Sequence, residues 1–288
     1  MKLNCKRALL ATAITALISQ AAFAAPYAAG DLLVGFRDPG QPNNTYVLDL
    51  GAATTYRDAT ANIHNITNIG ADLTSAFGSG WATDSTLFWG IVGNQNNSSS
   101  GSPVNGDPTR TLYGSQDQTV LGTQSNPASI TLSGTRGTVA NNITGFGSTF
   151  SSASANGAVN PNGIIFPTLG STQNNDWAEF NDGTNSFGST WGTGNNGVEG
   201  NSASGIPNTA LDLYRILNST SGASPTGTVG QGSYEGTFVI DAAGNISYFA
   251  SADLSSPSVP EPVSTGVLAG LAFVGIVGLR RRQTTVAA

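Results

Sequence analysis

Short apolar runs separated by turn-forming residues constrain the fold of this chain more than any other feature. Between residues 25 and 258, most of these runs are bounded by Gly, Asn, Pro or Ser and show little helical periodicity. Two hairpin signals are clear: segments 31–37 and 45–50 flank Asp38-Pro39-Gly40, and segments 237–240 and 246–249 flank the turn 241–245. Proline presets φ and glycine permits positive φ, so these sequences predict chain reversals between paired strands.

Further strands and two helices complete the expected body. Segments 87–92 and 111–113 flank a polar loop at 94–107, and segment 211–217 alternates apolar and polar residues as a half-buried strand does. Residues 62–78 and 136–152 carry apolar stripes at helical spacing. The stripe residues are Ile66, Ile69, Leu73 and Phe77 in the first segment, and Val139, Ile143, Phe146 and Phe150 in the second.

These patterns together predict one domain over residues 25–258. We expect a mainly β fold, a β-sandwich or jelly-roll-like body with one or two helices and long polar loops. The longest of these loops is expected at 171–205, which is mostly Asn, Gly, Ser and Thr. A C-terminal transmembrane helix is expected to follow the body.

The body is poor in charge and strongly acidic. Only 10% of the residues are charged, against about 25% in an average soluble domain. Residues 25–258 contain five arginines, no lysine and sixteen acidic residues, which gives a net charge of −11. Such a domain repels phosphate backbones, so we expect no binding of nucleic acid.

Cysteine and histidine are each present once. Cys5 lies in the N-terminal segment described next, and His64 lies in the expected helix 62–78. The body therefore has no thiol, and a single histidine cannot make a two-histidine metal site. We expect no cofactor, and a helix-face histidine rather than a catalytic base.

Residues 1–24 have the three parts of a secretory signal. Lys2, Lys6 and Arg7 precede an apolar run at 8–18, and small residues follow at Ala22 and Ala24. A signal peptidase reads such small residues, so cleavage is expected between Ala24 and Ala25. The alternative is an N-terminal membrane anchor, for which the apolar run is too short.

The C-terminal segment, residues 259–288, has a proline-rich start, an apolar stretch and a basic cluster. Val259-Pro260-Glu261-Pro262 cannot continue a helix. The seventeen residues 263–279 carry no charge and would span about 25 Å as a helix. Arg280, Arg281 and Arg282 follow directly and should stay on the cytoplasmic side. A core helix or a plain anchor would explain only some of these parts.

This order of parts resembles the PEP-CTERM proteins. The resemblance covers about the last thirty residues and implies recognition by an exosortase, a membrane enzyme that cuts near the Pro-Glu-Pro motif. It also implies transient anchoring in the inner membrane, followed by transfer to the cell surface or extracellular matrix of an exopolysaccharide-producing host.

Acidic and aromatic residues in the 171–205 loop are the ligand candidates. Asp176, Glu179 and Asp182 lie at three-residue spacing and could ligate calcium or act as glycosidase carboxylates, although a solvated loop is the favoured interpretation. Trp177 and Trp191 lie in polar, glycine-rich surroundings, which predicts exposed faces for sugar rings. Trp89 lies in an apolar strand, which predicts a core position.

The expected function is that of a secreted, exosortase-sorted, non-enzymatic surface or matrix protein associated with exopolysaccharide. Its expected partners are signal peptidase and exosortase during export. Two alternatives remain: a carbohydrate- or calcium-binding adhesin, and a secreted glycan hydrolase. The hydrolase would need two carboxylates that converge in a cleft.

Overall fold

The structure is a computed structural model that describes residues 27–40, 44–95, 101–118, 120, 122–152, 158–166, 177 and 198–251. The expected signal at 1–24 and the expected sorting tail at 259–288, with its apolar segment and arginines, lie outside the described residues. Within the described ranges, none of the helices combines the length and the apolar character needed to cross a membrane.

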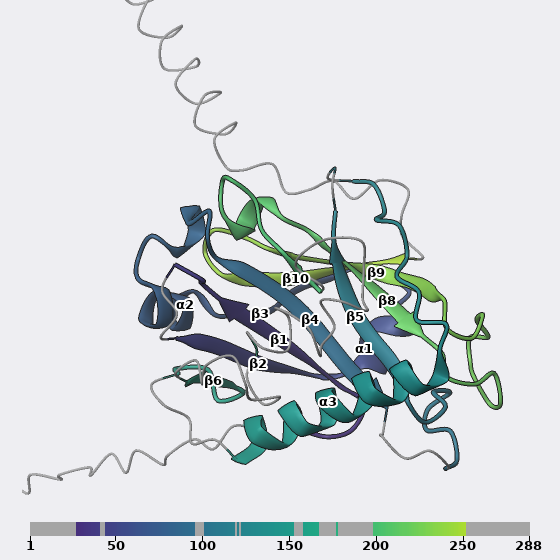
Figure 1. The fold of residues 1–288 in the computed structure, drawn as a ribbon. Helices are drawn as coiled ribbons and strands as arrows, with labels where there is room; N and C mark the ends of the chain where they lie inside the picture. Colours follow the sequence, from purple (N-terminus) through teal and green to yellow (C-terminus); the bar gives the residue numbers. More distant parts are fainter. Residues whose placement is uncertain are drawn as a thin grey trace, which may run out of the picture.

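The described body is mainly β, as the sequence predicts (Figure 1). Its ten strands form a single hydrogen-bonded sheet, with the order β3-β10-β9-β8-β5-β4-β1-β2-β6 and with β7 paired to β4. All of the neighbouring strands are antiparallel. The strands are β1 (Asp31–Arg37), β2 (Thr45–Ala52), β3 (Ile63–Asn68), β4 (Phe88–Gln95), β5 (Thr111–Asp117), β6 (Gly163–Phe166), β7 (Glu199–Gly200), β8 (Leu211–Ile216), β9 (Gly232–Ile240) and β10 (Asn245–Ala250).

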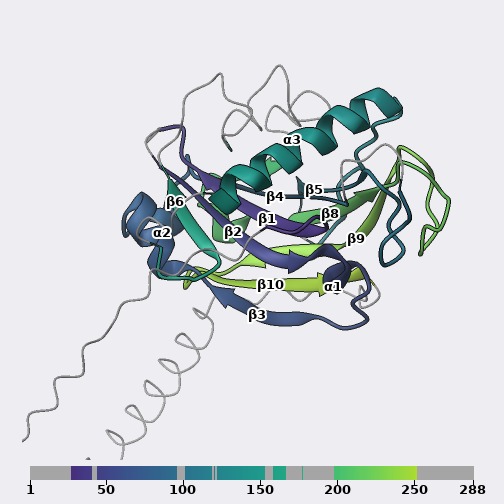
Figure 2. The same cartoon turned by 90° about the horizontal axis from the view of Figure 1, so that it is seen from below.

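The sheet curls, and the curl creates two layers that enclose a core (Figure 2). Alternate side chains of β1, β2 and β4 contribute to the same buried cluster as those of β9 and β10. Within it, the Tyr56 ring lies 5.0 Å from the Phe238 ring and 5.2 Å from the Tyr248 ring, measured between centroids. One curled sheet thus encloses a core in the way that the two expected sandwich sheets would.

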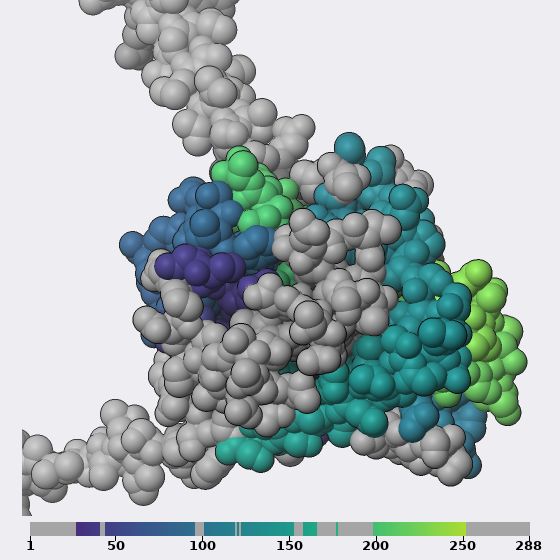
Figure 3. Space-filling model, in the orientation of Figure 1, coloured from purple at the N-terminus to yellow at the C-terminus, as the bar shows by residue number. Residues whose placement is uncertain are grey.

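The opposite, convex face carries a second apolar cluster covered by helix α3 (Ser133–Ser152). Val139, Ile143, Phe146 and Phe150 are buried there, which confirms the helical stripe read from residues 136–152. Figure 3 shows α3 running along the surface of the molecule. Because the sheet packs against apolar clusters on both faces, β8 is buried along its whole length and β1 is buried except at Asp31.

The local hairpin signals are confirmed. β1 pairs with β2 across Asp38-Pro39-Gly40, and the Asp38 carboxylate accepts the Gly40 N–H at 2.7 Å. β9 pairs with β10 across a turn in which Asp241 accepts the N–H groups of Ala243 and Asn245. β4 and β5 pair as the strands expected on either side of the polar loop.

The prediction of a helix over 62–78 is wrong in its first half. Residues 63–68 form β3, which pairs with β10, and the helix α2 covers only Gly70–Phe77. Leu73 and Phe77 are buried on that helix, as the stripe predicted, whereas Ile66 lies on the strand. A strand pairing with β10, far away along the chain, outweighs the local helical spacing.

The strand predicted at 211–217 exists as β8, but all six of its residues are buried rather than half of them. Asp212 and Arg215, the polar members of the alternation, have internal partners instead of solvent. The short helix α1 (Ala53–Arg57) and the 3-10 turns η1 (Trp81–Thr83) and η2 (Ile206–Asn208) complete the described elements.

Candidate functional site

The two edges of the curled sheet meet along a line that we call the seam, formed by β3 on one side and by β2 with residues 158–163 on the other. Asn160 donates from Nδ2 to Thr67 Oγ1 of β3 at 2.8 Å. Asp72, at the start of α2, accepts the Tyr46 hydroxyl at 2.9 Å and the Asn160 N–H at 3.1 Å. Polar contacts therefore hold together edges that are not joined by a strand ladder.

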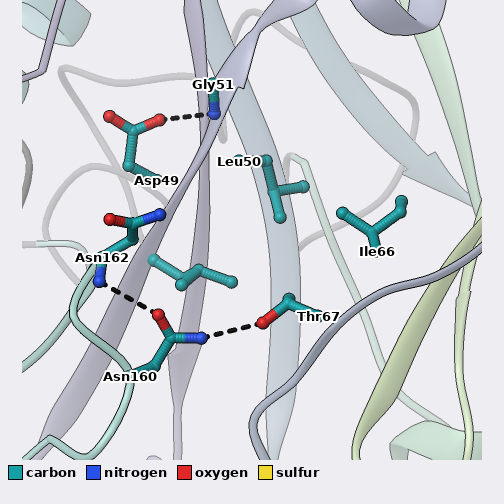
Figure 4. Close-up of a pocket in the computed structure, with 8 residues that line it drawn as sticks. Asp49, Leu50, Gly51, Ile66, Thr67, Asn160 and Asn162 are labelled. Carbon is teal, nitrogen blue, oxygen red and sulfur yellow. Dashed lines mark hydrogen bonds between the residues drawn. The ribbon is translucent and has the colours of Figure 1, made fainter.

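A pocket of about 240 Å³ opens at the seam (Figure 4). It is lined by apolar residues of β2 and β3 and by polar residues from β2, β3 and the turn before β6. The lining residues are Leu48, Asp49, Leu50, Gly51, Ile66, Thr67, Asn160 and Asn162.

A chain of hydrogen bonds follows the polar side of the pocket. The Asn162 N–H donates to Asn160 Oδ1 at 3.0 Å, and Asn160 in turn donates to Thr67 (Figure 4). The Asn162 carbonyl accepts the Asp49 N–H at 3.0 Å, so the backbone of Asn162 is fixed to β2. The Asn162 residue itself is exposed, and its amide can both donate and accept.

Asp49 contributes the one carboxylate of the pocket lining. Burial raises the pKa of Asp49 to about 6, against the lowering effect of the Gly51 N–H that it accepts, and the nearby Asp31 raises it further. Near neutral pH this carboxylate is ionised, and at mildly acidic pH it becomes protonated.

The chemistry available in this pocket is recognition of a ligand by hydrogen bonds and apolar contact. Asn160 already donates to Thr67 and accepts the Asn162 N–H, and the Asp49 carboxylate accepts the Gly51 N–H. The exposed Asn162 amide and the Thr67 hydroxyl hydrogen are therefore the polar groups left to a ligand beside the aliphatic walls of Leu50 and Ile66. A two-carboxylate hydrolysis would need a second acid in the pocket, and the lining supplies Asp49 alone.

The structure describes only one of the candidate ligand residues that the sequence places in the 171–205 loop. Asp176, Glu179, Asp182 and Trp191 lie outside the described residues. Trp177 is described, and the prediction that it is exposed is wrong, because its side chain is fully buried. It packs against Gly35 of β1, where an added Cβ would lie 2.1 Å from the Trp177 ring. Trp89 is in the core, as predicted.

A buried polar group holds Trp177 in place. Its indole Nε1 donates to Glu199 Oε1 at 2.6 Å. Arg37 donates from Nε to Glu199 Oε2 at 2.7 Å and lies in ion-pair contact with the same oxygen through Nη2. Trp177, which the sequence suggests as an exposed surface for a sugar ring, is thus a buried residue that packs against β1.

A second buried group, which we call the arginine cluster, comprises Arg57, Asp107, Tyr113, Arg215 and Glu235. Asp107 Oδ1 lies 3.0 Å from Arg57 Nη1 and 2.7 Å from Arg215 Nη2. Asp107 Oδ2 accepts the Tyr113 hydroxyl at 2.8 Å. Burial raises the pKa of Glu235 to about 7, while Ser233 and the two arginines oppose that rise.

His64 lies on β3 rather than on a helix, and its ring meets Phe249 edge-on at 5.7 Å between centroids. Among the described residues there is no group of three or more His, Cys, Asp or Glu side chains placed to hold a metal ion. The calcium candidates at 176–182 lie outside that set.

Sequence reasoning missed the pocket and the partners of Trp177, although signals for both exist. Pro161-Asn162-Gly163 precedes an apolar run, which is a turn-and-strand signature at β6. Gly35 stands inside a buried strand, where glycine often marks the close approach of another group.

Comparison of the chain with protein-family models, with curated proteins and with solved structures gave no match.

Proposed function

We propose that this protein is exported and sorted by an exosortase, and that its β body serves as a non-enzymatic component of the cell surface or extracellular matrix, in association with exopolysaccharide. Signal peptidase removes residues 1–24, and the inner membrane holds the precursor transiently through residues 263–279. The body then acts outside the cell.

The observation that carries this proposal is the order of the C-terminal parts. Val259-Pro260-Glu261-Pro262, an uncharged stretch of seventeen residues and a triple arginine stand in immediate succession. The stretch is just long enough to span a bilayer, and the arginines resist translocation. A plain anchor explains the last two parts, whereas the exosortase motif explains all three.

The use of the acidic side chains in the body supports a structural rather than a catalytic role. Carboxylates on many elements accept hydrogen bonds from the protein itself, often from backbone N–H groups of their own turns. These include Asp31, Asp38, Asp49, Asp72, Asp84, Asp107, Glu199, Asp212, Glu235 and Asp241.

Mass spectrometry of the natively secreted protein tests the proposal. We expect a mature chain that begins at Ala25 and ends near Pro262. Recovery of secreted protein that still ends in the 263–288 segment would contradict it. Changing Arg280, Arg281 and Arg282 together to Ala should weaken tail processing, because the charges that hold the tail at the cytoplasmic face are gone.

The seam pocket favours a second candidate, a carbohydrate-binding adhesin. Its polar side offers amide and hydroxyl groups, which are suited to sugar hydroxyls. A saturable ligand distinguishes this candidate from a purely structural matrix protein, and turnover of a glycan would favour the hydrolase instead.

A further inference from the structure

We propose that the seam pocket binds one neutral, hydroxyl-rich ring, such as a single neutral sugar residue at a chain end or branch of a polysaccharide. This inference names a class of ligand for the second candidate function, the carbohydrate-binding adhesin. It rests on the proposed function in one respect: an extracellular polysaccharide would supply the ligand.

The size of the pocket limits the ligand to one ring. Its volume is about 240 Å³, below the roughly 300 to 1,000 Å³ of pockets that enclose drug-sized ligands. Leu50 and Ile66 provide apolar contact for the carbon-bound hydrogens of a ring. A longer chain would have to extend out of the pocket into solvent.

The polar lining matches groups that both donate and accept hydrogen bonds. An amide offers two donors and one carbonyl acceptor, and a hydroxyl can adopt either role. Asn162 is exposed at the pocket while its backbone is fixed to Asp49 of β2, so its side chain is presented without being needed for the fold. Sugar hydroxyls have the same dual character.

Charge selects a neutral ligand over an acidic one. The eight lining residues include Asp49 and contain no Lys, Arg or His. The surrounding body carries a net charge of −11. An acidic sugar or a phosphate would therefore find no cation to pair with and would be repelled by the net negative charge, whereas a neutral ring would not be repelled.

The position of the pocket couples binding to the closure of the sheet. Asp49 and Leu50 belong to β2, Ile66 and Thr67 to β3, and Asn160 to the turn that bridges the two edges. A ligand that contacts all three segments binds the folded seam and not the unfolded chain. Binding should therefore raise the melting temperature.

Calorimetry and thermal unfolding of the full chain in mild detergent test the inference, with glucose, galactose, mannose and glucuronate as probes. We expect saturable binding of at least one neutral hexose, with a rise in melting temperature. The change Asn162→Ala should weaken that binding about tenfold, the value of one good hydrogen bond to the ligand. Thr67→Val should weaken it to a similar or smaller degree.

The matched control is Asn141→Ala on the exposed side of α3, which should leave binding unchanged. Three results would each overturn the inference: no saturable binding of any neutral hexose, an unchanged dissociation constant in Asn162→Ala, or glucuronate binding as tightly as glucose.

The two proposals fail separately. A normally processed, secreted protein that binds no hexose contradicts only the pocket assignment. A protein that binds hexose but keeps its 263–288 segment after secretion contradicts only the sorting proposal.

Discussion

The arginine cluster and the seam pocket use similar polar chemistry in opposite ways. In the cluster both oxygens of Asp107 are occupied, one by two guanidinium groups and the other by the Tyr113 hydroxyl. At the seam Asn162 is exposed, and its backbone alone holds it to β2. Burial makes the difference, because an unsatisfied polar group inside the protein is costly while one at the surface is hydrated.

This contrast suggests that the internal polar groups define the fold, whereas the exposed Asn162 side chain of the pocket can be changed at little cost to stability. A charge-poor body has few arginines, and it places Arg37, Arg57, Arg136 and Arg215 in the interior. The following predictions test whether the two regions differ in this way.

The largest effect should come from Asp107→Ala. It leaves the guanidinium groups of Arg57 and Arg215 buried without their shared carboxylate, and we expect a loss of about 3 to 5 kcal/mol in unfolding free energy. Urea unfolding of the full chain measures it. Asp58→Ala is the matched control, because Asp58 bonds the same Arg57 but its side chain is 55% exposed. Equal losses in the two variants would contradict the contrast.

The next largest effect should come from Gly35→Ala, which should lower the unfolding free energy by up to about 3 kcal/mol through overpacking. The new Cβ would lie 2.1 Å from Trp177 Cδ2, so the indole must move off β1 and strain its bond to Glu199. Tryptophan fluorescence and thermal unfolding report the change. Gly80→Ala, where an added Cβ meets nothing within 4 Å, should have little effect.

Stability should fall as the pH rises from 5 to 8. Burial raises the pKa of Glu235 from 4.5 to about 7, so the folded state binds more protons than the unfolded state across this window. The contribution of Glu235 to stability is fully present below its pKa in the unfolded chain and is lost as the pH rises through its folded-state pKa of about 7. The expected loss in unfolding free energy is on the order of 2 kcal/mol. Asp49, with its pKa raised to about 6, adds a loss in the same direction.

The variant Glu235→Gln isolates the contribution of the cluster to this pH dependence. Its unfolding free energy should vary less between pH 5 and pH 8 than that of the unchanged protein, since only Asp49 and smaller contributors still titrate. If the unfolding free energy of Glu235→Gln changed with pH as steeply as that of the unchanged protein, the pH dependence would have to arise from groups other than Glu235.

The smallest effect should come from Asn162→Ala, with a change in unfolding free energy of less than about 0.5 kcal/mol. Its backbone hydrogen bonds to Asp49 and Asn160 do not depend on the side chain. A loss as large as that of Gly35→Ala would mean that the seam, like the interior, depends on this side chain for its stability.

The sequence predicted those parts of the fold that local chemistry decides. Each confirmed hairpin contains its own turn residues, such as Pro39 and Gly40 between β1 and β2. The helix α3 is long enough for its apolar spacing to be visible despite its glycines, which lower helix propensity. In contrast, the sequence predicts a helix where β3 forms, because Ile66 continues the apolar spacing of α2.

The site depended on contacts that no linear pattern contains. The pocket combines residues 48–51, 66–67 and 160–162, which come together only when the two sheet edges meet. Trp177 looked exposed because its neighbours in sequence are polar, but its neighbours in space are Gly35, Glu199 and Phe146. Only the absence of a side chain at Gly35 hinted at the approach of a large ring.

The inward placement of the arginines also affects how long the body can persist outside a cell. Proteases of the trypsin type bind a basic side chain in an acidic specificity pocket before they cut. Residues 25–258 contain no lysine, and all five of their arginines lie in the described part of the chain. Four of those arginines are buried, and Arg110 is half-buried beside β5. A trypsin-like protease in the surroundings would therefore find almost no accessible cutting point on the folded body.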